Sequence, residues 1–370
     1  MNIKDKIKCF IDCYIPTETC NLRCHYCYIT QKRKFNSKLA SFSHTPVEIR
    51  RALSKERWGG PCLINLCAGG ETLLSDEVLP IVKELLLEGH YIMIVTNGTV
   101  TKRFDEMAQW SSDLLSHLFF KFSYHFLEFK RLGWIERFFE NVLKMKRAGA
   151  SFTVEITPSD ELIPYIEDVR STCMQYVGAL CHVTVTRDER TQGIDVMSNL
   201  SWEEYKTIWG QFGSALFDFK TEIFSQKRNE FCYAGAWSYF LNLEEGTLVQ
   251  CYRGEELGNI YRDIDIPMPK KPIGHNCEFP HCYNGHAFLS LGDIPELPAP
   301  TFAEERNRIC GDGSEWLQPE MKAFMSTKLY ESNEQYGNLK KVKIGFKQWA
   351  VRKGIRNTKI YKAYHKALGK

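Results

Sequence analysis

The sequence has no long apolar runs, which argues against a membrane-spanning helix. Its longest apolar runs fall well short of the about 18 residues that a span needs. Residues 1–15 carry charges too close to their short apolar stretch to form a secretory signal. The net charge is only +3, which by itself gives no argument for a nucleic-acid partner. We therefore expect a cytoplasmic protein that does not bind nucleic acid.

The composition equally lacks the features of a disordered or a disulfide-stapled chain. Its 44% of hydrophobic and 25% of charged residues are typical of a soluble globular protein. Fourteen cysteines occur, but cytosolic reductants keep thiols reduced, so we interpret them as metal ligands and buried thiols. Six lie in or beside apolar runs and are expected in the core: Cys9, Cys13, Cys62, Cys67, Cys173 and Cys181.

Strand-like and helix-like segments alternate through residues 1–200, which is the pattern of β/α units around a parallel sheet. Strands are expected at 9–14, 62–66, 91–96, 118–124, 152–157 and 182–186. Helices are expected at 46–58, 76–88, 102–110, 130–147 and 160–177. Since 370 residues exceed the about 250–300 at which one core stops growing, a second, smaller domain should follow.

Three cysteines directly follow the first expected strand. Cys20, Cys24 and Cys27 stand in TETCNLRCHYCYIT. Iron–sulfur clusters normally take four Cys ligands and structural zinc sites also close with four, so a compact trio indicates a cluster with one iron left open. The alternative is a zinc knuckle that uses His25 or a distant residue as its fourth ligand.

The trio is followed by CAGGETLL, placed after the apolar run at 61–66. The CxxxCxxC spacing and this GGE segment, in this order, resemble the radical S-adenosylmethionine (SAM) superfamily. The resemblance implies a partial (β/α)6 barrel and a 4Fe-4S cluster whose open iron binds SAM. It further implies reductive cleavage of SAM to a 5′-deoxyadenosyl radical that abstracts hydrogen.

The resemblance also implies cofactor-binding residues at the C-terminal ends of the strands, where barrels of this type hold their chemistry. Tyr26 would lie beside the adenine, or merely cover the cluster. Gly69, Gly70 and Glu71 would meet the methionyl amino group, because glycine lets the backbone approach a ligand closely. Ser123 would contact the ribose and Arg187 the carboxylate or ribose; the alternatives are a plain strand-end hydroxyl and a solvated loop charge.

Glu155 interrupts an otherwise apolar strand. Because an unpaired buried carboxylate is costly, we predict a catalytic role in which it holds SAM or substrate.

A second cysteine group begins with Cys232, Gly246 and Cys251, whose spacing resembles the C-x(9–15)-G-x4-C signature of SPASM and twitch auxiliary-cluster domains. A β-hairpin at 237–252 would bring Cys232 and Cys251 together, and Cys277 and Cys282 would complete four ligands. Because the further downstream CxxC-led set of full SPASM domains is missing, we expect one auxiliary 4Fe-4S cluster of the twitch type, with zinc as the alternative. The domains would then be 1–200, the barrel; 201–300, a helix capped by Ser201 and Glu204 followed by the cluster domain; and 301–370, a helical, basic tail.

Relatives with auxiliary clusters act on two classes of substrate. We predict hydrogen abstraction from a peptide or protein, leading to oxidation, a crosslink or epimerisation, with flavodoxin or ferredoxin as electron donor. The alternatives are a dehydrogenase or epimerase of a sugar, favoured by the few residues before the first strand, and a non-catalytic iron–sulfur or zinc scaffold. Cys310, outside both cysteine groups, is a candidate hydrogen donor.

The last part of this tail, residues 340–370, carries charge of one sign. From Lys340 onward it contains many Lys and Arg and no Asp or Glu, with aromatic and aliphatic residues interleaved. Such a segment either meets an anionic membrane surface or partner, or packs on the body as a solvated helix.

Overall fold

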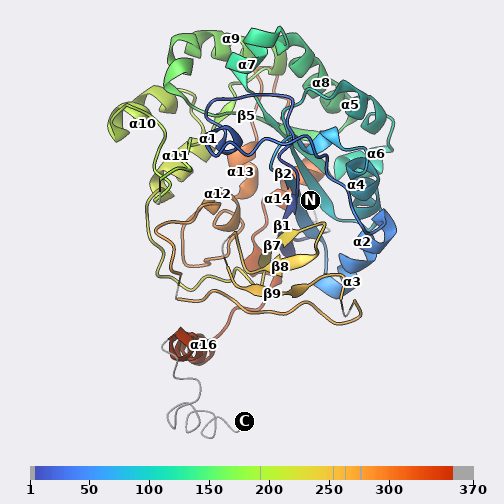
Figure 1. Cartoon of the computed structure of the whole chain (residues 1–370), viewed down its shortest axis with the longest axis vertical. Coiled ribbons are helices and arrows are strands. Elements are labelled where there is room, and N and C mark those ends of the chain that lie inside the picture. Colours follow the sequence, from blue (N-terminus) through green and yellow to red (C-terminus); the bar gives the residue numbers. More distant parts are fainter. Residues whose placement is uncertain (1–4, 192, 253, 263, 276, 353–370) are drawn as a thin grey trace, which may run out of the picture.

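The computed structural model describes residues 5–352 except 192, 253, 263 and 276. Six parallel strands form the predicted partial barrel (Figure 1): β1 (Cys9–Ile15), β2 (Cys62–Ala68), β3 (Tyr91–Thr96), β4 (Leu118–Ser123), β5 (Ser151–Ile156) and β6 (His182–Val183). The sheet stays open, with the order β6-β5-β4-β3-β2-β1-β7-β8-β9. The predicted fold class is confirmed.

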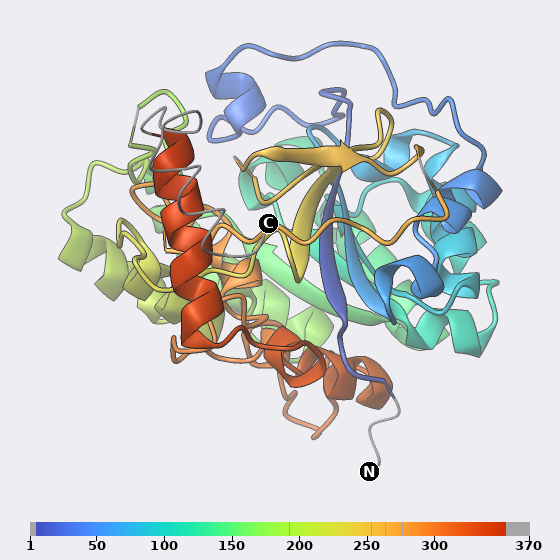
Figure 2. The same ribbon diagram turned by 90° about the horizontal axis from the view of Figure 1, so that it is seen from below.

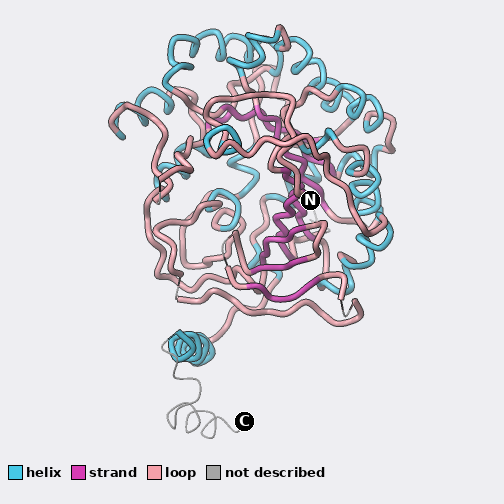
Figure 3. The backbone as a smooth tube through the Cα atoms, viewed as in Figure 1, coloured by secondary structure: helices cyan, strands magenta, loops and turns pink. Residues whose placement is uncertain are grey.

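The helices between these strands are, along the chain, α1 (Tyr28–Gln31), α2 (Pro46–Ala52), α3 (Lys55–Trp58), η1 (Thr72–Leu74), α4 (Val78–Leu87), α5 (Thr101–Met107), α6 (Ser112–Ser116), α7 (Phe126–Leu132), α8 (Ile135–Ala148), η2 (Asp160–Tyr165) and α9 (Ile166–Val177). The longer helices lie around the outside of the sheet, whereas α1 lies inside the arc that they form (Figure 1 and Figure 3).

Three expected helices are each broken once, for local reasons. The segment expected at 46–58 is split because Ser54 caps a new helix, accepting a hydrogen bond from the Arg57 amide. The one expected at 130–147 starts earlier and is divided by Gly133, whose φ of 69° ends α7 in the left-handed conformation. The one expected at 160–177 opens as a 3-10 turn that contains Pro164. The sixth strand is also shorter than expected and ends at Val183.

The strands present two different faces. Outward residues such as Ile11, Ile64 and Phe120 belong to the large apolar cluster under the helices. Inward residues near the N-terminal ends of the strands, such as Phe10 and Phe119, belong to a second cluster. The helices α12 (Gly285–Phe288), α13 (Phe302–Arg306) and α14 (Pro319–Met325) contribute several of its other side chains and lie on the concave side of the sheet (Figure 1). They close the bottom of the barrel.

The region after residue 200 is joined to the same sheet. The predicted cap of α10 (Trp202–Gly210) is confirmed, since Ser201 and Glu204 form a capping box; α11 (Ala215–Ile223) comes next. The predicted hairpin forms from β7 (Ser238–Asn242) and β8 (Thr247–Val249), with Gly246 at a φ of 73°. Because β7 pairs in parallel with β1, and β9 (Glu256–Asn259) continues the sheet, no break in the sheet separates the two regions.

The chain ends its described part in two further helices, α15 (Leu329–Ser332) and α16 (Asn338–Arg352). The second half of the predicted basic tail, 353–370, lies outside the described residues. Within the described part of the chain, none of the helices combines the length and the hydrophobicity of a membrane span.

Candidate active site

The three N-terminal cysteines surround a common cavity. Cys20, Cys24 and Cys27 lie in the loop after β1 and line a space of about 90 Å³ at the C-terminal ends of β1–β4. Burial raises the pKa of all three thiols, that of Cys20 to about 11. Within the described residues, no three Cys, His, Asp or Glu side chains converge closely enough to hold a single metal ion. Cys20, Cys24 and Cys27 present three soft sulfur donors to this cavity, which suits an iron–sulfur cluster.

The GGE segment packs directly against this loop. The Gly70 amide donates to the Thr17 carbonyl oxygen (2.7 Å) and the Glu71 amide to that of Thr19 (2.9 Å). A Cβ on Gly70 would lie 1.9 Å from the Thr19 oxygen, so no side chain fits there. Both glycines line the cavity. Glycine at position 70 is thus required by the crossing of two chain segments, a reason different from the ligand approach inferred from sequence.

Glu71 points its carboxylate into the protein. It accepts hydrogen bonds from the Thr96 hydroxyl (2.6 Å) and from the amides of Asn97 (2.7 Å) and Leu73 (3.0 Å). Burial raises the pKa of Glu71, while these donors oppose that rise. The carboxylate therefore holds the end of β3 in place, and Asn97 in turn donates to the Asn21 side chain of the cysteine loop (2.8 Å).

The predicted residue Ser123, the last of β4, reaches the same cavity, and so does His125, two residues beyond the strand. The Tyr26 hydroxyl lies 2.6 Å from Nδ1 of His125, which ties the cysteine loop to the end of β4. Burial, assisted by Lys121, lowers the pKa of His125 to about 4, so its imidazole is neutral at pH 7.

Residues 14–160 match the model of the Radical SAM superfamily. The chain carries a radical SAM domain. Proteins of this superfamily are enzymes, and the match implies a 4Fe-4S cluster and SAM for the domain at 14–160. Comparison with curated protein sequences yields no significant match.

Solved structures resemble about two thirds of the chain at low identity. SuiB of Streptococcus suis is 13% identical with a TM-score of 0.48, over 70% of this chain and 65% of that one. The chain thus spans less than two thirds of SuiB. Native anSMEcpe with bound AdoMet and Cp18Cys peptide is 15% identical with a TM-score of 0.47, over 69% of this chain and 78% of that one.

Glu155 lies inside the radical SAM barrel but is not unpaired, so the sequence interpretation needs correction. Its carboxylate contacts Nζ of Lys121 (3.1 Å) and Nη1 of Arg306 (3.0 Å). Although burial alone would raise the pKa of Glu155, these two cations and His182 lower it below its usual value. Sequence reasoning missed both partners. Lys121 could have been found, because it alternates with apolar residues in FFKF, but Arg306 gives no such signal.

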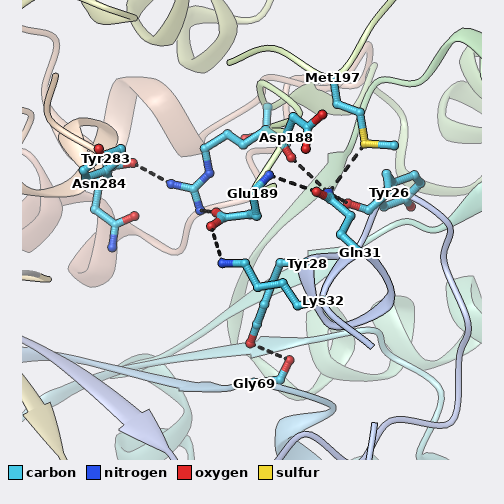
Figure 4. Close-up of polar contacts among 12 residues, drawn as sticks. Tyr26, Tyr28, Gln31, Lys32, Gly69, Asp188, Glu189, Met197, Tyr283 and Asn284 are labelled. Carbon is cyan, nitrogen blue, oxygen red and sulfur yellow. Dashed lines mark hydrogen bonds and ion pairs between the residues drawn. The ribbon is translucent and has the colours of Figure 1, made fainter. Parts of the chain in front are cut away.

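Arg187 does not line the cavity that Cys20, Cys24 and Cys27 surround. Its Nη1 donates to the Tyr283 carbonyl oxygen (3.1 Å) and its Nη2 lies 3.5 Å from Glu189. Figure 4 shows how this loop is fastened to α1: Gln31 contacts Tyr26 and Met197, and Glu189 contacts Lys32. Arg187 lines a second, small cavity together with polar groups of the later region, namely Lys220, His281, Cys282 and His286.

The second cysteine group lies next to this cavity, and Cys282 is one of the residues that line it. Cys232 and Cys282 pack against the same apolar cluster. Burial raises the pKa of Cys232, and nearby Cys282 and Cys251 raise it further. Burial likewise raises the pKa of Cys282, with added effects from Cys251 and Cys277. Cys282 therefore lies within electrostatic range of each of the other three thiols.

Cys310 is not brought to the radical SAM site. The carbonyl oxygen of Trp316, six residues after Cys310, accepts a hydrogen bond from the Phe152 amide. Cys310 therefore lies near the N-terminal end of β5, whereas the radical SAM site lies at the C-terminal ends of the strands. Its thiol is buried and donates to the Val177 carbonyl oxygen (3.2 Å). This position gives no support to the hydrogen-donor role expected from sequence.

Proposed function

We propose that this protein reductively cleaves SAM at Cys20, Cys24 and Cys27 and abstracts hydrogen from a C–H bond of a peptide or protein. The observation that carries the proposal is the cavity in which three thiols face Gly69, Gly70 and Ser123 at the C-terminal ends of β1–β4. When bound, the cluster and SAM supply the deoxyadenosyl radical.

The chain's own residues shape and seal the site. Glu71 and Asn97 hold the end of β3 under the cysteine loop. The Tyr26–His125 contact fixes the loop against β4, and the neutral His125 adds no charge to the cavity. A site held fixed in this way suits radical chemistry because it keeps the reacting groups in one orientation.

Removal of the three thiols tests the proposal. The variant Cys20→Ala/Cys24→Ala/Cys27→Ala, incubated without oxygen with SAM and dithionite, should form no 5′-deoxyadenosine. A matched control replaces three fully buried core cysteines, Cys13, Cys173 and Cys181, by Ala and should retain SAM cleavage. A non-catalytic scaffold would form no 5′-deoxyadenosine even as wild type, and cleavage by the first variant would refute the ligand assignment.

We further propose that Cys232, Cys251, Cys277 and Cys282 hold one auxiliary 4Fe-4S cluster, in a twitch-like region at 201–300. The electrostatic influence between Cys282 and each of the other three thiols supports a shared site. In the N-terminal triple variant, anaerobic reconstitution should leave about four irons and four sulfides. Zinc without sulfide would assign this region to a structural zinc site.

The cationic side chains around the second cavity favour a substrate with an anionic group, although the cavity itself, at about 10 Å³, has room for no more than about one water molecule. Arg187 and Lys220 line the second cavity, with the imidazoles of His281 and His286 beside them. Burial, and then the nearby cations Arg187 and Lys121, lower the pKa of Lys220 well below its usual value. A bound anion would offset this repulsion and restore the charge of Lys220.

Fractionation of cell extracts tests this substrate class. Fractions that raise 5′-deoxyadenosine formation above the uncoupled level should bind an anion exchanger, and peptidase treatment should abolish the effect. Lys220→Met should lose this stimulation and keep the uncoupled level. Resistance to peptidase would favour the sugar alternative. In deuterated water, uptake of one deuterium by the product would indicate epimerisation, and loss of hydrogens oxidation. We place the enzyme in the cytoplasm, with flavodoxin or ferredoxin as electron donor.

A further inference from the structure

The helix α16 is attached to the body along one side only. Lys341 pairs with Glu296 (2.7 Å) and the Gln348 amide donates to the Pro272 carbonyl oxygen (3.0 Å). Ile344 packs against the apolar cluster at the bottom of the barrel. These residues share one face, since 341, 344 and 348 follow the three- and four-residue spacing of a helix. Figure 2 shows α16 lying against the outside of the molecule.

The opposite face carries apolar side chains that the body does not cover. Leu339 is 81% exposed, Val342 68% and Trp349 46%. At about 100° per residue these three positions fall within an arc of about 80°, roughly opposite Lys341 and Gln348. Phe346 falls in the same arc, and its ring lies 5.7 Å from that of Trp349. An apolar stripe thus runs along the outer face for three turns.

Positive charge flanks this stripe. Lys340, Lys343 and Lys347 stand beside it along the helix, and residues 340–370 contain no Asp or Glu at all. A helix with Trp, Phe and Leu on one face and Lys on the flank has the composition of helices that lie in the interface of a membrane. The long lysine stems extend along apolar surface while the ammonium groups reach anionic headgroups.

We infer that α16 docks this protein onto an anionic lipid surface, with the stripe of Leu339, Val342 and Trp349 entering the headgroup region and the lysines contacting the lipid charges. The outward stripe, the lysine flank and the missing acidic residues all match this occupant. The inference is independent of the proposed function, because it uses no residue of the radical SAM site.

Vesicle sedimentation tests the inference with the full-length protein. Vesicles of phosphatidylcholine with about 30% phosphatidylglycerol should bind at least about tenfold more protein than pure phosphatidylcholine, because several lysines each add to the attraction. Raising the salt from about 0.1 M to 1 M should remove most of this difference, because the Debye length shrinks from about 10 Å to 3 Å. Equal binding to both vesicle types would overturn the inference.

A matched pair of variants localises the contact. Leu339→Ser/Val342→Ser/Trp349→Ser should reduce binding to the anionic vesicles about tenfold. The control Val47→Ser/Ile266→Ser/Ile309→Ser removes three apolar side chains that are equally exposed elsewhere, at 56%, 59% and 69%, and should bind as wild type does. Both variants should keep uncoupled SAM cleavage. Wild-type binding by the α16 variant, or binding to an acidic protein but to no vesicle, would contradict the lipid assignment.

Discussion

The buried charged side chains of this protein pair with partners that are distant in sequence. Glu155 and Arg306 are both almost fully buried and lie 3.0 Å apart. An unpaired buried charge is far more costly than a paired one, so the two side chains are mutually dependent. This ion pair, together with Lys121, forms a polar layer above the apolar bottom of the barrel.

Removal of one partner should therefore cost more than removal of both. Arg306→Met should lower the free energy of unfolding by about 3–5 kcal/mol, because it leaves the Glu155 carboxylate without its nearest cation. Glu155→Leu/Arg306→Met should be less destabilised, since the Glu155 carboxylate is removed together with its nearest cation. Urea unfolding followed by circular dichroism measures both. A double variant less stable than Arg306→Met would contradict this account.

A single buried residue, His182, makes the stability of the folded protein depend on pH. Its ring contacts the Ser214 hydroxyl (3.1 Å) and the Asn307 carbonyl oxygen (3.2 Å), and burial, assisted by Arg308, lowers its pKa from 6.5 to about 3. The unfolded chain therefore binds a proton near pH 6.5 that the folded chain refuses. The stabilisation is complete above pH 6.5 and is lost as the pH falls towards 3.

The variant His182→Gln should not show this loss of stability at low pH. Between pH 7 and pH 5 the wild type should lose about 2 kcal/mol more unfolding free energy than His182→Gln, from one titrating group. Urea unfolding at both pH values measures the difference. Parallel pH profiles for the two proteins would show that His182 is not the group responsible.

At the scale of elements, the cysteine loop and the GGE segment behave as one unit. Two backbone hydrogen bonds, from Gly70 and Glu71, join the segment after β2 to the loop after β1. The loop that carries the thiols is thus shaped by its neighbour, and the close crossing at Gly70 leaves no space for a methyl group.

Gly70→Ala should consequently disrupt the N-terminal cluster. The variant should bind about four fewer irons per chain after reconstitution, because the loop can no longer hold its three thiols around the cavity. Gly210→Ala serves as control, since a Cβ there meets nothing within 4 Å, and alanine favours the helix α10. Iron analysis and 5′-deoxyadenosine formation measure the outcome; a Gly70→Ala protein with full iron and full activity would contradict the assigned crossing.

At the scale of the molecule, the C-terminal third completes the barrel. Phe302, Met321 and Phe324 pack on inward residues at the N-terminal ends of the strands. Leu329 bonds through its amide to the Leu291 carbonyl oxygen, and the Lys328 ammonium reaches three carbonyl oxygens, including those of Ser290 and Pro300. The segment at 301–333 therefore belongs to the barrel, and only α16 lies outside it.

Two truncations separate these roles. A chain of residues 1–300 should be insoluble on expression, because it exposes the apolar bottom of the barrel. A chain of residues 1–337 should stay soluble, cleave SAM and keep its thermal midpoint within about 3 °C. Solubility, midpoint and 5′-deoxyadenosine formation decide between them, and a well-folded 1–300 protein would show that the segment at 301–333 is dispensable.

The sequence alone determined the features that depend on short-range patterns. Short apolar runs marked all six strands to within a few residues, Ser201 and Glu204 marked a helix start, and the Cys20–Cys27 spacing with GGE marked the cavity. Each of these signals is complete within a few residues, because hydrophobic period, capping and ligand spacing are local properties.

Only the tertiary structure decided which distant residues meet. It paired Glu155 with Arg306, placed β7 beside β1, turned Arg187 towards Tyr283 and placed Cys310 at the far edge of the sheet. Nothing within the local segments specifies these contacts. These contacts result from the strand order of the sheet and from the way α12–α14 fill its concave side, because a buried polar side chain must pair with a partner that this arrangement brings near.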